Sequence, residues 1–235
     1  MMNLFFSKEI SPPLFTFNPE ESRHIVKVLR LTKHHRISIT DGAGRLYSGK
    51  IVDDNIKKCT VELDDTVVLE QKKNYKLHIA IALTKNLSRI EWFVEKAVEV
   101  GIDEITPMLC RHSERIHFKA DRLEKIAIAA VKQSQQLWLP TINELTSFDE
   151  IVTKTPSGEG YIAFVDSASS GSFLKSVYSP GRNATILIGP EGDFSEEEIS
   201  LALKKGFTSI SLGKNRLRTE TAALFACFSF NILNQ

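Results

Sequence analysis

The sequence is short of the features that mark exported, membrane-spanning and metal-binding proteins. Only three cysteines occur in 235 residues, Cys59, Cys110 and Cys227, and they are far apart and odd in number. They predict packed, reduced thiols in a cytoplasmic protein rather than a disulfide framework. No apolar run reaches the roughly 18 residues that suggest a membrane span, and the opening residues, MMNLFFSKEI, lack a secretion signal. The six histidines show no metal-ligand spacing with these cysteines, so we expect no metal site.

The charge balance lacks a dominant sign. Lysine and arginine number 30 against 29 acidic residues, and the net charge of +1 gives no overall signature of nucleic-acid binding. Between Ser22 and Thr40, however, five lysines and arginines and three histidines occur without an acid. A helix over SRHIVKVLRL would have a basic face with Arg23, Lys27 and Arg30, and an apolar face with Ile25, Val28 and Leu29. Such a basic face can bind the phosphates of RNA, but a solvated helix surface accounts for it equally well.

Residues 1–72 predict a small β-rich domain. Arg36–Thr40 alternates apolar and polar residues, a turn follows at Asp41–Gly44, and Arg45–Val52 returns as the second strand of a hairpin. A further strand is indicated by the alternating residues Cys59, Val61 and Leu63. Short strands with one helix suggest a small barrel. The polar segment Glu70–Asn74 contains no apolar residue, and we expect the domain boundary there.

Residues 73–235 alternate strands with helices. Buried strands are predicted at Tyr75–Leu83, Glu104–Leu109, Tyr161–Val165, Ala184–Ile188 and Phe207–Leu212. Between the first two, a helix over Ser88–Val100 has a possible capping box of Ser88 and Glu91 and a stop at Gly101. A long amphipathic helix is predicted over Lys119–Gln136. This alternation is typical of an α/β domain whose parallel sheet is covered on both faces.

Two segments near the C-terminus share the same predicted order of strand, loop and helix. TILIGPEGDFSEEEI (Thr185–Ile199) and SISLGKNRLRTETAAL (Ser209–Leu224) each contain a short apolar strand, a loop with glycine and a capped helix. Since a single helix separates the two strands, both loops should lie at the same edge of one parallel sheet. α/β proteins bind their ligands at such an edge.

The two loops differ in charge. Gly189 and Gly192 permit close backbone approach to a ligand, and Pro190 stiffens the turn. The acidic residues that follow argue against an anion and favour a neutral or cationic ligand, although a tight turn without a ligand is also possible; they are Glu191, Asp193 and Glu196–Glu198. The second loop, Gly213–Thr219, is basic and precedes a helix that Thr219 or Thr221 could cap. We expect a polyanion near Arg216 and Arg218.

These segments resemble the C-terminal signature of the RsmE-type ribosomal RNA methyltransferases of the SPOUT superfamily. The matching stretches are LIGPEGDFSEEEI and LGKNRLRTETAAL. Further matches upstream are Lys85, Glu95–Ile102, Pro107, Arg111, Ser113, Gln133, Ser134, Leu139 and Pro140. The resemblance runs from Lys85 to Ala223, and residues 1–72 agree in size and basic character.

The resemblance implies a fold and an activity. Residues 1–72 would form a PUA-like, RNA-binding β-barrel, and residues 73–235 a SPOUT methyltransferase domain with a C-terminal trefoil knot, which the hydrophobic pattern alone does not predict. Such proteins bind S-adenosyl-L-methionine in the knot. They act as homodimers and methylate N3 of a uridine in the small-subunit (16S) ribosomal RNA.

Carried over residue by residue, the resemblance gives candidate site residues. The cofactor would be lined by Leu187, Ile188, Gly189, Pro190, Glu191, Gly192, Ser211, Leu212 and Gly213, with Leu217, Arg218, Thr219, Glu220 and Thr221 closing over it. This sequence departs from the family's commoner pattern at three positions. Asp193 stands where many relatives have glycine, and Lys132 and Gln136 stand where glutamate and arginine are frequent, which puts any shared RNA or dimer contact on that helix in doubt.

Methylation at uridine N3 requires loss of the N3 proton, so the site needs a base or donors that stabilise the anion. We expect Arg218 to stabilise the anion, since a guanidinium is no base at ordinary pH. Glu191 or Glu220 could accept the proton, although both could be structural. Basic residues for RNA phosphates would be Arg111, Arg115 and Arg216, besides Arg23, Lys27 and Arg30. The alternatives are a SPOUT ribose 2′-O-methyltransferase and a non-catalytic RNA-binding protein of ribosome assembly.

Overall fold

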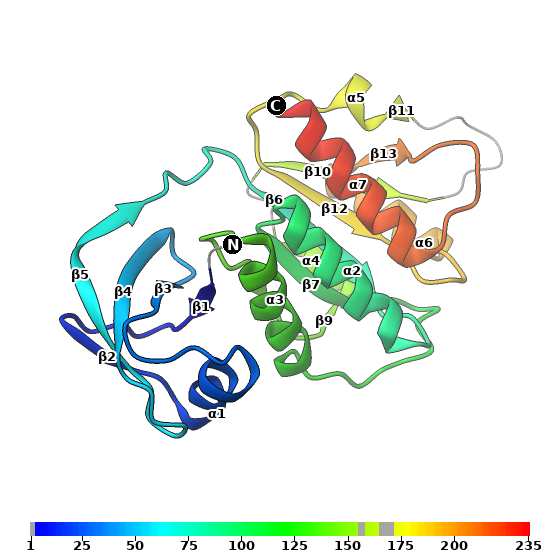
Figure 1. The fold of residues 1–235 in the computed structure, drawn as a ribbon. Helices are drawn as coiled ribbons and strands as arrows, with labels where there is room; N and C mark the ends of the chain where they lie inside the picture. The colour runs from blue at the N-terminus through cyan, green and yellow to red at the C-terminus, as the bar shows by residue number, and fades with distance from the viewer. Residues whose placement is uncertain (1–2, 155–157, 165–171) are drawn as a thin grey trace. The chain divides into compact units, whose positions relative to one another are not determined.

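The computed structural model describes residues 3–154, 158–164 and 172–235 of the chain (Figure 1). The contacts among these residues divide them into two compact units. The first unit comprises residues 1–72 together with 131–139, and the second comprises residues 73–130 together with 140–235. None of the helices within the described residues is both long and apolar enough to cross a membrane.

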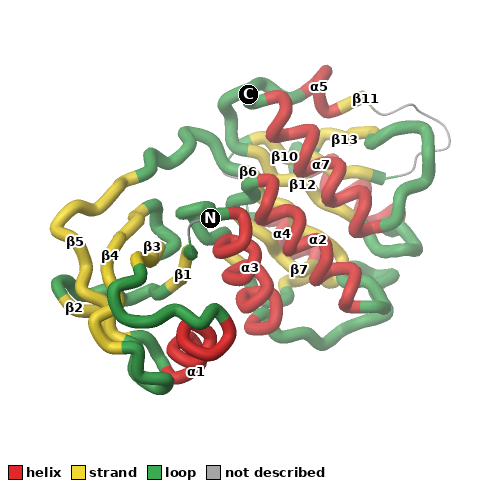
Figure 2. The backbone as a smooth tube through the Cα atoms, in the orientation of Figure 1, coloured by secondary structure: helices red, strands yellow, loops and turns green. Residues whose placement is uncertain are grey.

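A five-stranded sheet forms the first unit (Figure 2). Its order is β1 (Leu4–Phe6), β3 (Arg36–Thr40), β4 (Arg45–Asp53), β5 (Thr60–Leu69) and β2 (Leu14–Thr16). All neighbouring strands are antiparallel except β1 and β3. The predicted hairpin is confirmed as β3 and β4, and the Asp41 carboxylate accepts hydrogen bonds from the N–H groups of Ala43 and Arg45 in its turn (2.7 and 3.1 Å). The inward residues of these strands, with Ile25, make the core of the unit.

The continuous helix expected over SRHIVKVLRL is not formed. Instead, α1 (Pro19–Arg23) begins at the N-cap Asn18 and passes into a π-helical turn, η1 (His24–Val28). The Leu29 N–H donates to the His24 carbonyl five residues back, which shifts the faces of the turn relative to an α-helix. Ile25 is therefore buried, but Val28 and Leu29 are exposed, contrary to the predicted apolar face. Arg30 lies beyond the turn with φ of +56°.

Residues 131–139 pack within the first unit through backbone hydrogen bonds. The Gly44 N–H donates to the Leu137 carbonyl, and the Leu139 N–H donates to the Gly42 carbonyl, both over 2.9 Å. Lys132 forms an ion pair with Glu21 over 2.6 Å. The charge of Lys132, one of the three departures from the family pattern, is thus engaged within its own chain.

The second unit contains a parallel sheet with the order β11-β13-β10-β12-β6-β7-β8, and β9 pairs with β7 beside β8. The five predicted strands are confirmed as β6 (Leu77–Ala82), β7 (Glu104–Leu109), β10 (Glu159–Ala163), β12 (Ala184–Ile188) and β13 (Thr208–Ser211). Val165, the expected end of the third of these, lies outside the described residues. Three further strands of two residues each were not predicted: β8 (Thr141–Ile142), β9 (Thr146–Ser147) and β11 (Ser172–Phe173).

The helices of the second unit begin and end at local signals. They are α2 (Leu87–Val100), α3 (Asp121–Ser134, which continues into the first unit), α4 (Phe148–Thr153), α5 (Leu174–Val177), α6 (Glu196–Lys204) and α7 (Thr219–Leu233). The predicted stop at Gly101 is confirmed by its φ of +99°. The predicted capping box at Ser88 is wrong, because Asn86 is the N-cap and its Oδ1 accepts from both the N–H and the hydroxyl of Ser88.

Helices cover both faces of the parallel sheet, as predicted. In Figure 1, α2 and α7 lie on the near face, and α4 and α6 lie on the far face. Side chains of α4 and α6 pack with Ala80, Ala82 and Leu187 in one buried cluster. Ile79 and Ile81, which alternate with these alanines along β6, are fully buried as well. The sheet is therefore apolar on both sides, and polar groups for a ligand must come from its edges.

The three cysteines are buried and free, which confirms the prediction of packed thiols. Burial raises the pKa of Cys59 to about 11 and that of Cys227 to about 12. Burial also raises the pKa of Cys110. All three thiols are therefore protonated near neutral pH and are poor nucleophiles.

Candidate functional site

The loops after β12 and β13 lie at one edge of the parallel sheet, which confirms the prediction. Both strands pair with β10, which runs between them, and Ala163 of β10 is in register with Ile188 on one side and Ile210 on the other. The ends of β12 and β13 are thus two strand spacings apart, about 10 Å. We call residues 189–195 the first loop and residues 212–218 the second loop.

The first loop is held in a tight conformation. A Cβ on Gly189 would lie 3.1 Å from the Phe194 ring, so a larger residue would push against the core. Asp193 has φ of +62°, the left-handed conformation that glycine adopts most easily, and its Oδ1 accepts from the Phe194 N–H over 2.8 Å. Aspartate tolerates this conformation better than most residues. The turn can therefore form with Asp193 at this position, where many relatives have glycine.

Two hydrogen bonds join the second loop and the start of α7 to the first loop. The Thr219 hydroxyl donates to the Gly189 carbonyl over 3.0 Å, and Thr219 is buried. The Arg216 guanidinium donates to the Glu191 carbonyl over 3.3 Å. The expectation that Thr219 or Thr221 caps α7 is wrong, because Arg218 is the N-cap and makes no side-chain capping bond. The hydroxyl of Thr219 bonds to the first loop instead of to its own helix.

The N-terminus of α6 is already occupied by side chains. The predicted capping box of Ser195 and Glu198 is confirmed. The Glu198 carboxylate accepts from the N–H of Ser195 over 2.8 Å and from the N–H of Arg111 over 2.9 Å. The pKa of Glu197 is lowered, first by a hydrogen bond from its own N–H, then by the Ser195 hydroxyl and the Arg111 guanidinium. Because the Ser195 and Glu198 side chains already accept from N–H groups at this helix end, and the Glu198 carboxylate is negative, the helix end does not favour a phosphate. This agrees with the acidic character of the loop.

The loop after β7 contacts the first loop as well. His112 Nδ1 donates to the Asp193 carbonyl over 3.0 Å. The Arg111 guanidinium forms an ion pair with Glu197 over 3.3 Å, between two mostly exposed side chains. Arg111, expected to bind RNA phosphates, is therefore engaged in a weak surface pair that a phosphate could replace at little cost.

The predicted catalytic residues follow two different strands, β12 and β13, and lie in different environments. Arg218 is exposed, and its guanidinium has no hydrogen bond or ion pair to any residue that the structure describes. Glu191 is also exposed. Glu220 is buried, and its Oε1 lies 3.8 Å from Nε of Arg89 on α2. Its Oε2 is buried without a hydrogen-bond partner among the described residues.

The predicted cofactor residues divide between strand ends and loops. Leu187 and Ile188 are buried in β12, so only their backbone can face a ligand, and Ser211 and Leu212 are half-buried at the end of β13. Gly213 has φ of +124° and no atom within 4 Å of the place where a Cβ would be, so the second loop is open there. Pro190 follows in the first loop, and the second loop ends at Leu217, with Thr221 exposed in α7.

The basic residues expected to bind RNA are all accessible except Arg115, which is half-buried. Arg23, Lys27 and Arg30 are exposed in the first unit, and Arg216 is exposed in the second loop. Arg115 donates from Nη2 to the Lys85 carbonyl over 3.3 Å.

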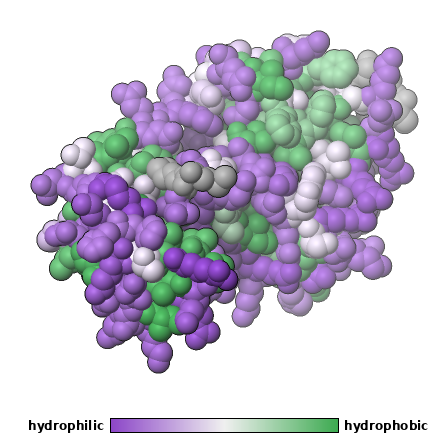
Figure 3. Space-filling view, viewed as in Figure 1, coloured by the Kyte–Doolittle hydropathy of each residue, from purple (hydrophilic) through white to green (hydrophobic). Residues whose placement is uncertain are grey.

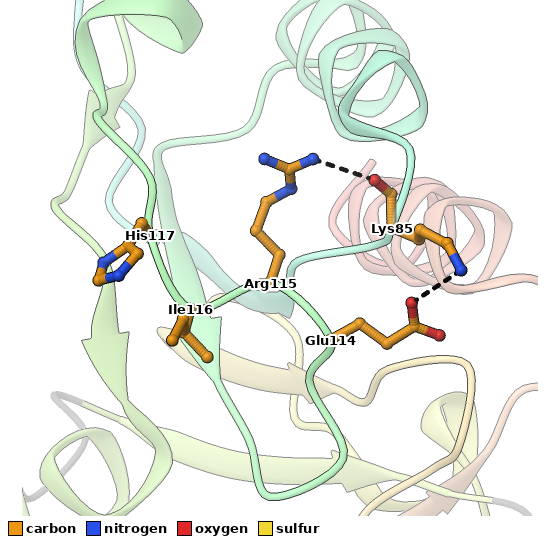
Figure 4. Close-up of a pocket in the computed structure, with 5 residues that line it drawn as sticks. All are labelled: Lys85, Glu114, Arg115, Ile116 and His117. Atoms are coloured by element: carbon orange, nitrogen blue, oxygen red, sulfur yellow. Dashed lines mark hydrogen bonds and ion pairs between the residues drawn. The ribbon is translucent and has the colours of Figure 1, made fainter.

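Sequence reasoning missed a pocket at the same edge of the sheet. It has a volume of about 370 Å³ and is lined by Lys85, Glu114, Arg115, Ile116 and His117 (Figure 4). Lys85 follows β6 and the other four residues follow β7. The rule that ligands bind beyond the carboxyl ends of parallel strands would have pointed to these residues.

Comparisons with known proteins agree with this geometry. A family model described as "RNA methyltransferase domain" matches residues 71–231, and one described as "RNA methyltransferase PUA domain" matches residues 17–64. The chain is 29% identical to "Ribosomal RNA small subunit methyltransferase E" of Synechocystis over 232 residues, covering 96% of this chain and 75% of that protein.

Solved structures are similar over the whole chain. A "probable rRNA-methyltransferase" from Porphyromonas gingivalis is 39% identical with a TM-score of 0.92, covering 99% of this chain and 98% of that one. The ribosomal RNA small subunit methyltransferase E from Neisseria gonorrhoeae, solved bound to S-adenosyl methionine, is 26% identical with a TM-score of 0.85. That match covers 100% of this chain and 98% of the other.

Proposed function

This chain belongs to the RNA methyltransferase family, and we propose that it methylates N3 of a uridine in small-subunit (16S) ribosomal RNA with S-adenosylmethionine as methyl donor. The observation that carries the proposal is the joining of the two loops by the hydrogen bond from Thr219 to Gly189, at the ligand-binding edge of the sheet. The relatives named small subunit methyltransferase E support the choice of RNA, and the resemblance to RsmE-type proteins supports the choice of uridine N3.

The residues present fit the donor. Gly189 and Gly192 let the backbone of the first loop pack closely against Phe194 and His112, and Gly213 leaves open space in the second loop. The unpartnered Oε2 of Glu220 is a buried acceptor beside these loops, which suits a ligand that carries donors or positive charge. S-adenosylmethionine supplies an electrophilic methyl group on a sulfonium cation when bound. We propose that residues 187–192, 211–213 and 217–221 hold it.

Arg218 has the properties that the anion-stabilising role requires. Its guanidinium is exposed, stays charged at ordinary pH and is not engaged by any described residue, so it is available to the oxygens of a uracil that has lost its N3 proton. Glu191 or Glu220 would accept the proton. The Arg89 guanidinium balances the charge of Glu220 and holds its carboxylate in place, whereas the Glu191 side chain is free to turn toward solvent.

RNA would contact both units. We propose residues 1–72 as the RNA-binding domain, in which Arg23, Lys27 and Arg30 contact phosphates, and residues 73–235 as the methyltransferase domain. In the second domain, Arg111, Arg115 and Arg216 would contact phosphates near the loops. Each of these contacts contributes to affinity and makes binding sensitive to salt.

We further propose the trefoil knot and the homodimer that the resemblance implies, and a cytoplasmic location, where ribosomal subunits are assembled.

The exposed face of α7 supports a second copy as partner. Phe225, Phe228 and Ile232 recur along this helix with exposed fractions of 48, 47 and 64%, and Trp92 of the adjacent α2 is 43% exposed. Figure 3 shows apolar surface where Figure 1 places α7. An apolar stripe of this kind is typical of an interface. Light scattering should give twice the monomer mass.

The test is methyl transfer to its expected substrate. Purified protein would be incubated with labelled S-adenosylmethionine and small ribosomal subunits from a strain that lacks the gene, and the product nucleosides would be identified by mass spectrometry. We expect N3-methyluridine. A methyl group on the ribose would favour a 2′-O-methyltransferase, and RNA binding without any methyl transfer would favour a non-catalytic assembly protein.

A further inference from the structure

We propose that the pocket lined by Lys85, Glu114, Arg115, Ile116 and His117 receives a single RNA nucleotide, with its phosphate against the two cations and its base against Ile116 and His117. We call it the nucleotide pocket. This proposal rests on the function proposed above, since it names where the RNA substrate would enter the site. The pocket belongs to neither of the two loops that hold the proposed donor.

The nucleotide pocket lies at the carboxyl edge of the sheet, beside the first loop. Lys85 follows β6, and residues 114–117 follow β7, its neighbour. On its other side β6 pairs with β12, with Ile81 in register with Ile188, the residue before Gly189. Lys85 and the first loop therefore extend from strands that are one spacing apart, about 5 Å, and residues 114–117 extend from a strand two spacings from β12, about 10 Å.

Contacts of α2 place the pocket near the proposed catalytic arginine. Arg89 is four residues from Lys85, and four residues of extended chain span at most about 14 Å. Its Nε lies 3.8 Å from Oε1 of Glu220, which is two residues from Arg218. A nucleotide in the pocket would thus be within reach of both the first loop and the start of α7.

The size and chemistry of the pocket suit one nucleotide. Its volume of about 370 Å³ is at the low end of the roughly 300–1,000 Å³ of ligand sites, which leaves no room for a stretch of duplex. Lys85 and Arg115 carry the positive charge that a phosphate needs. Ile116 is 58% exposed and offers apolar surface, and an imidazole ring such as that of His117 can stack on a base.

The two cations of the pocket, Lys85 and Arg115, make weak contacts that a phosphate can replace. Figure 4 shows the Arg115 guanidinium directed at the Lys85 carbonyl and the Lys85 ammonium directed at Glu114, with Ile116 and His117 on the other side of Arg115. One hydrogen bond uses one of five guanidinium donors and fixes its orientation. The Lys85–Glu114 pair spans 3.2 Å between side chains that are 80 and 62% exposed. Such a pair is worth about 0–1 kcal/mol, so a phosphate can take the place of Glu114 cheaply.

A second anion shares this chemistry, namely the carboxylate of the donor's methionyl group. We assign the pocket to the RNA phosphate because Ile116 and His117 offer a surface on which a base can stack, and the methionyl carboxylate brings no base to this surface. The two sources predict different losses when the cations are removed.

The test compares Lys85→Ala, Arg115→Ala and a control, Lys204→Ala, which removes an exposed lysine at the end of α6, on the opposite edge of the sheet. The KM for small subunits would be measured together with the affinity for S-adenosylhomocysteine by calorimetry. We expect each pocket variant to raise KM at least tenfold with cofactor affinity within twofold, and the control to change neither. Unchanged KM in both pocket variants, or a tenfold loss of cofactor affinity, would overturn the proposal.

Two additions keep the result interpretable. Because Lys85 is mostly exposed, its removal leaves the fold intact even if Arg115→Ala does not. Photo-crosslinking of RNA that carries 4-thiouridine at the methylated position should label residues 114–117, and labelling elsewhere would contradict the proposal. If the wild-type protein transfers no methyl group at all, the proposed function itself fails, which is a different outcome.

Discussion

Replacing Thr219 with valine removes one hydroxyl from the contact between the two loops and keeps the shape of the side chain. That hydroxyl donates to the Gly189 carbonyl over 3.0 Å, and Thr219 is only 5% exposed. Valine cannot donate, so the carbonyl loses its partner in a place that water hardly reaches. Leaving a buried acceptor unsatisfied costs about 1–3 kcal/mol. Threonine and valine have similar helix propensities, so the start of α7 contributes little to the change.

The loss should appear both in stability and in ligand affinity, because both loops hold the proposed donor. We expect the free energy of unfolding in urea to fall by about 1–2 kcal/mol. An equal loss in binding would weaken the affinity for S-adenosylhomocysteine by about 5–30-fold. Calorimetry on the folded variant measures this affinity directly.

Thr219→Ser is the matched control. Serine keeps the hydroxyl and loses only a methyl group, so its affinity should stay within about twofold of the wild type while stability falls modestly. If Thr219→Val binds the product as tightly as the wild type, the hydrogen bond does not couple the loops and the reasoning is wrong.

Three further predictions concern single side chains. Arg218→Ala should slow single-turnover methyl transfer by at least about 100-fold with nearly unchanged cofactor affinity; lost affinity with an unchanged rate would contradict the catalytic role. Asp193→Ala should destabilise the protein by about 1 kcal/mol because alanine disfavours the φ of +62°, whereas Asp193→Gly should be neutral or stabilising; equal melting temperatures for the two variants would count against this. Glu197→Gln should be less stable than the wild type at neutral pH. Because hydrogen bonds and Arg111 lower the pKa of Glu197 in the folded state, that difference should vanish as pH falls below about 4; a constant difference from pH 7 to pH 3 would refute it.

The parts of the fold that follow from local sequence were predictable. Apolar runs such as Ala184–Ile188 and Glu104–Leu109 are strands with the predicted bounds. The capping box of Ser195 and Glu198 and the stop at Gly101 also formed as predicted, because each depends on residues within one helical turn. The common edge of the two loops followed from the parallel sheet.

The parts that depend on distant contacts were not predictable. Thr219 bonds to a carbonyl 30 residues away rather than capping its own helix, and no local pattern indicates that choice. Asn86 caps α2 in place of Ser88, and the two candidates lie within one turn of each other, so the sequence alone does not distinguish them. The π-helical turn at His24–Val28 altered the predicted faces because one hydrogen bond shifted by a residue.

The pairing of Arg89 with Glu220 has the same origin. The two residues are far apart in the sequence and meet because α2 and α7 pack side by side on the sheet. Likewise, the nucleotide pocket joins Lys85 with residues that follow the neighbouring strand. The sequence shows the chemistry of each side chain, and only the packing shows which of them meet.

Amide hydrogen exchange of the wild-type protein, with and without saturating S-adenosylmethionine, tests the central claim most directly. If the loops after β12 and β13 jointly enclose the donor, the amides of residues 187–192 and 211–221 should exchange more slowly when it is present. Protection confined to other segments, or none at all, would contradict the account.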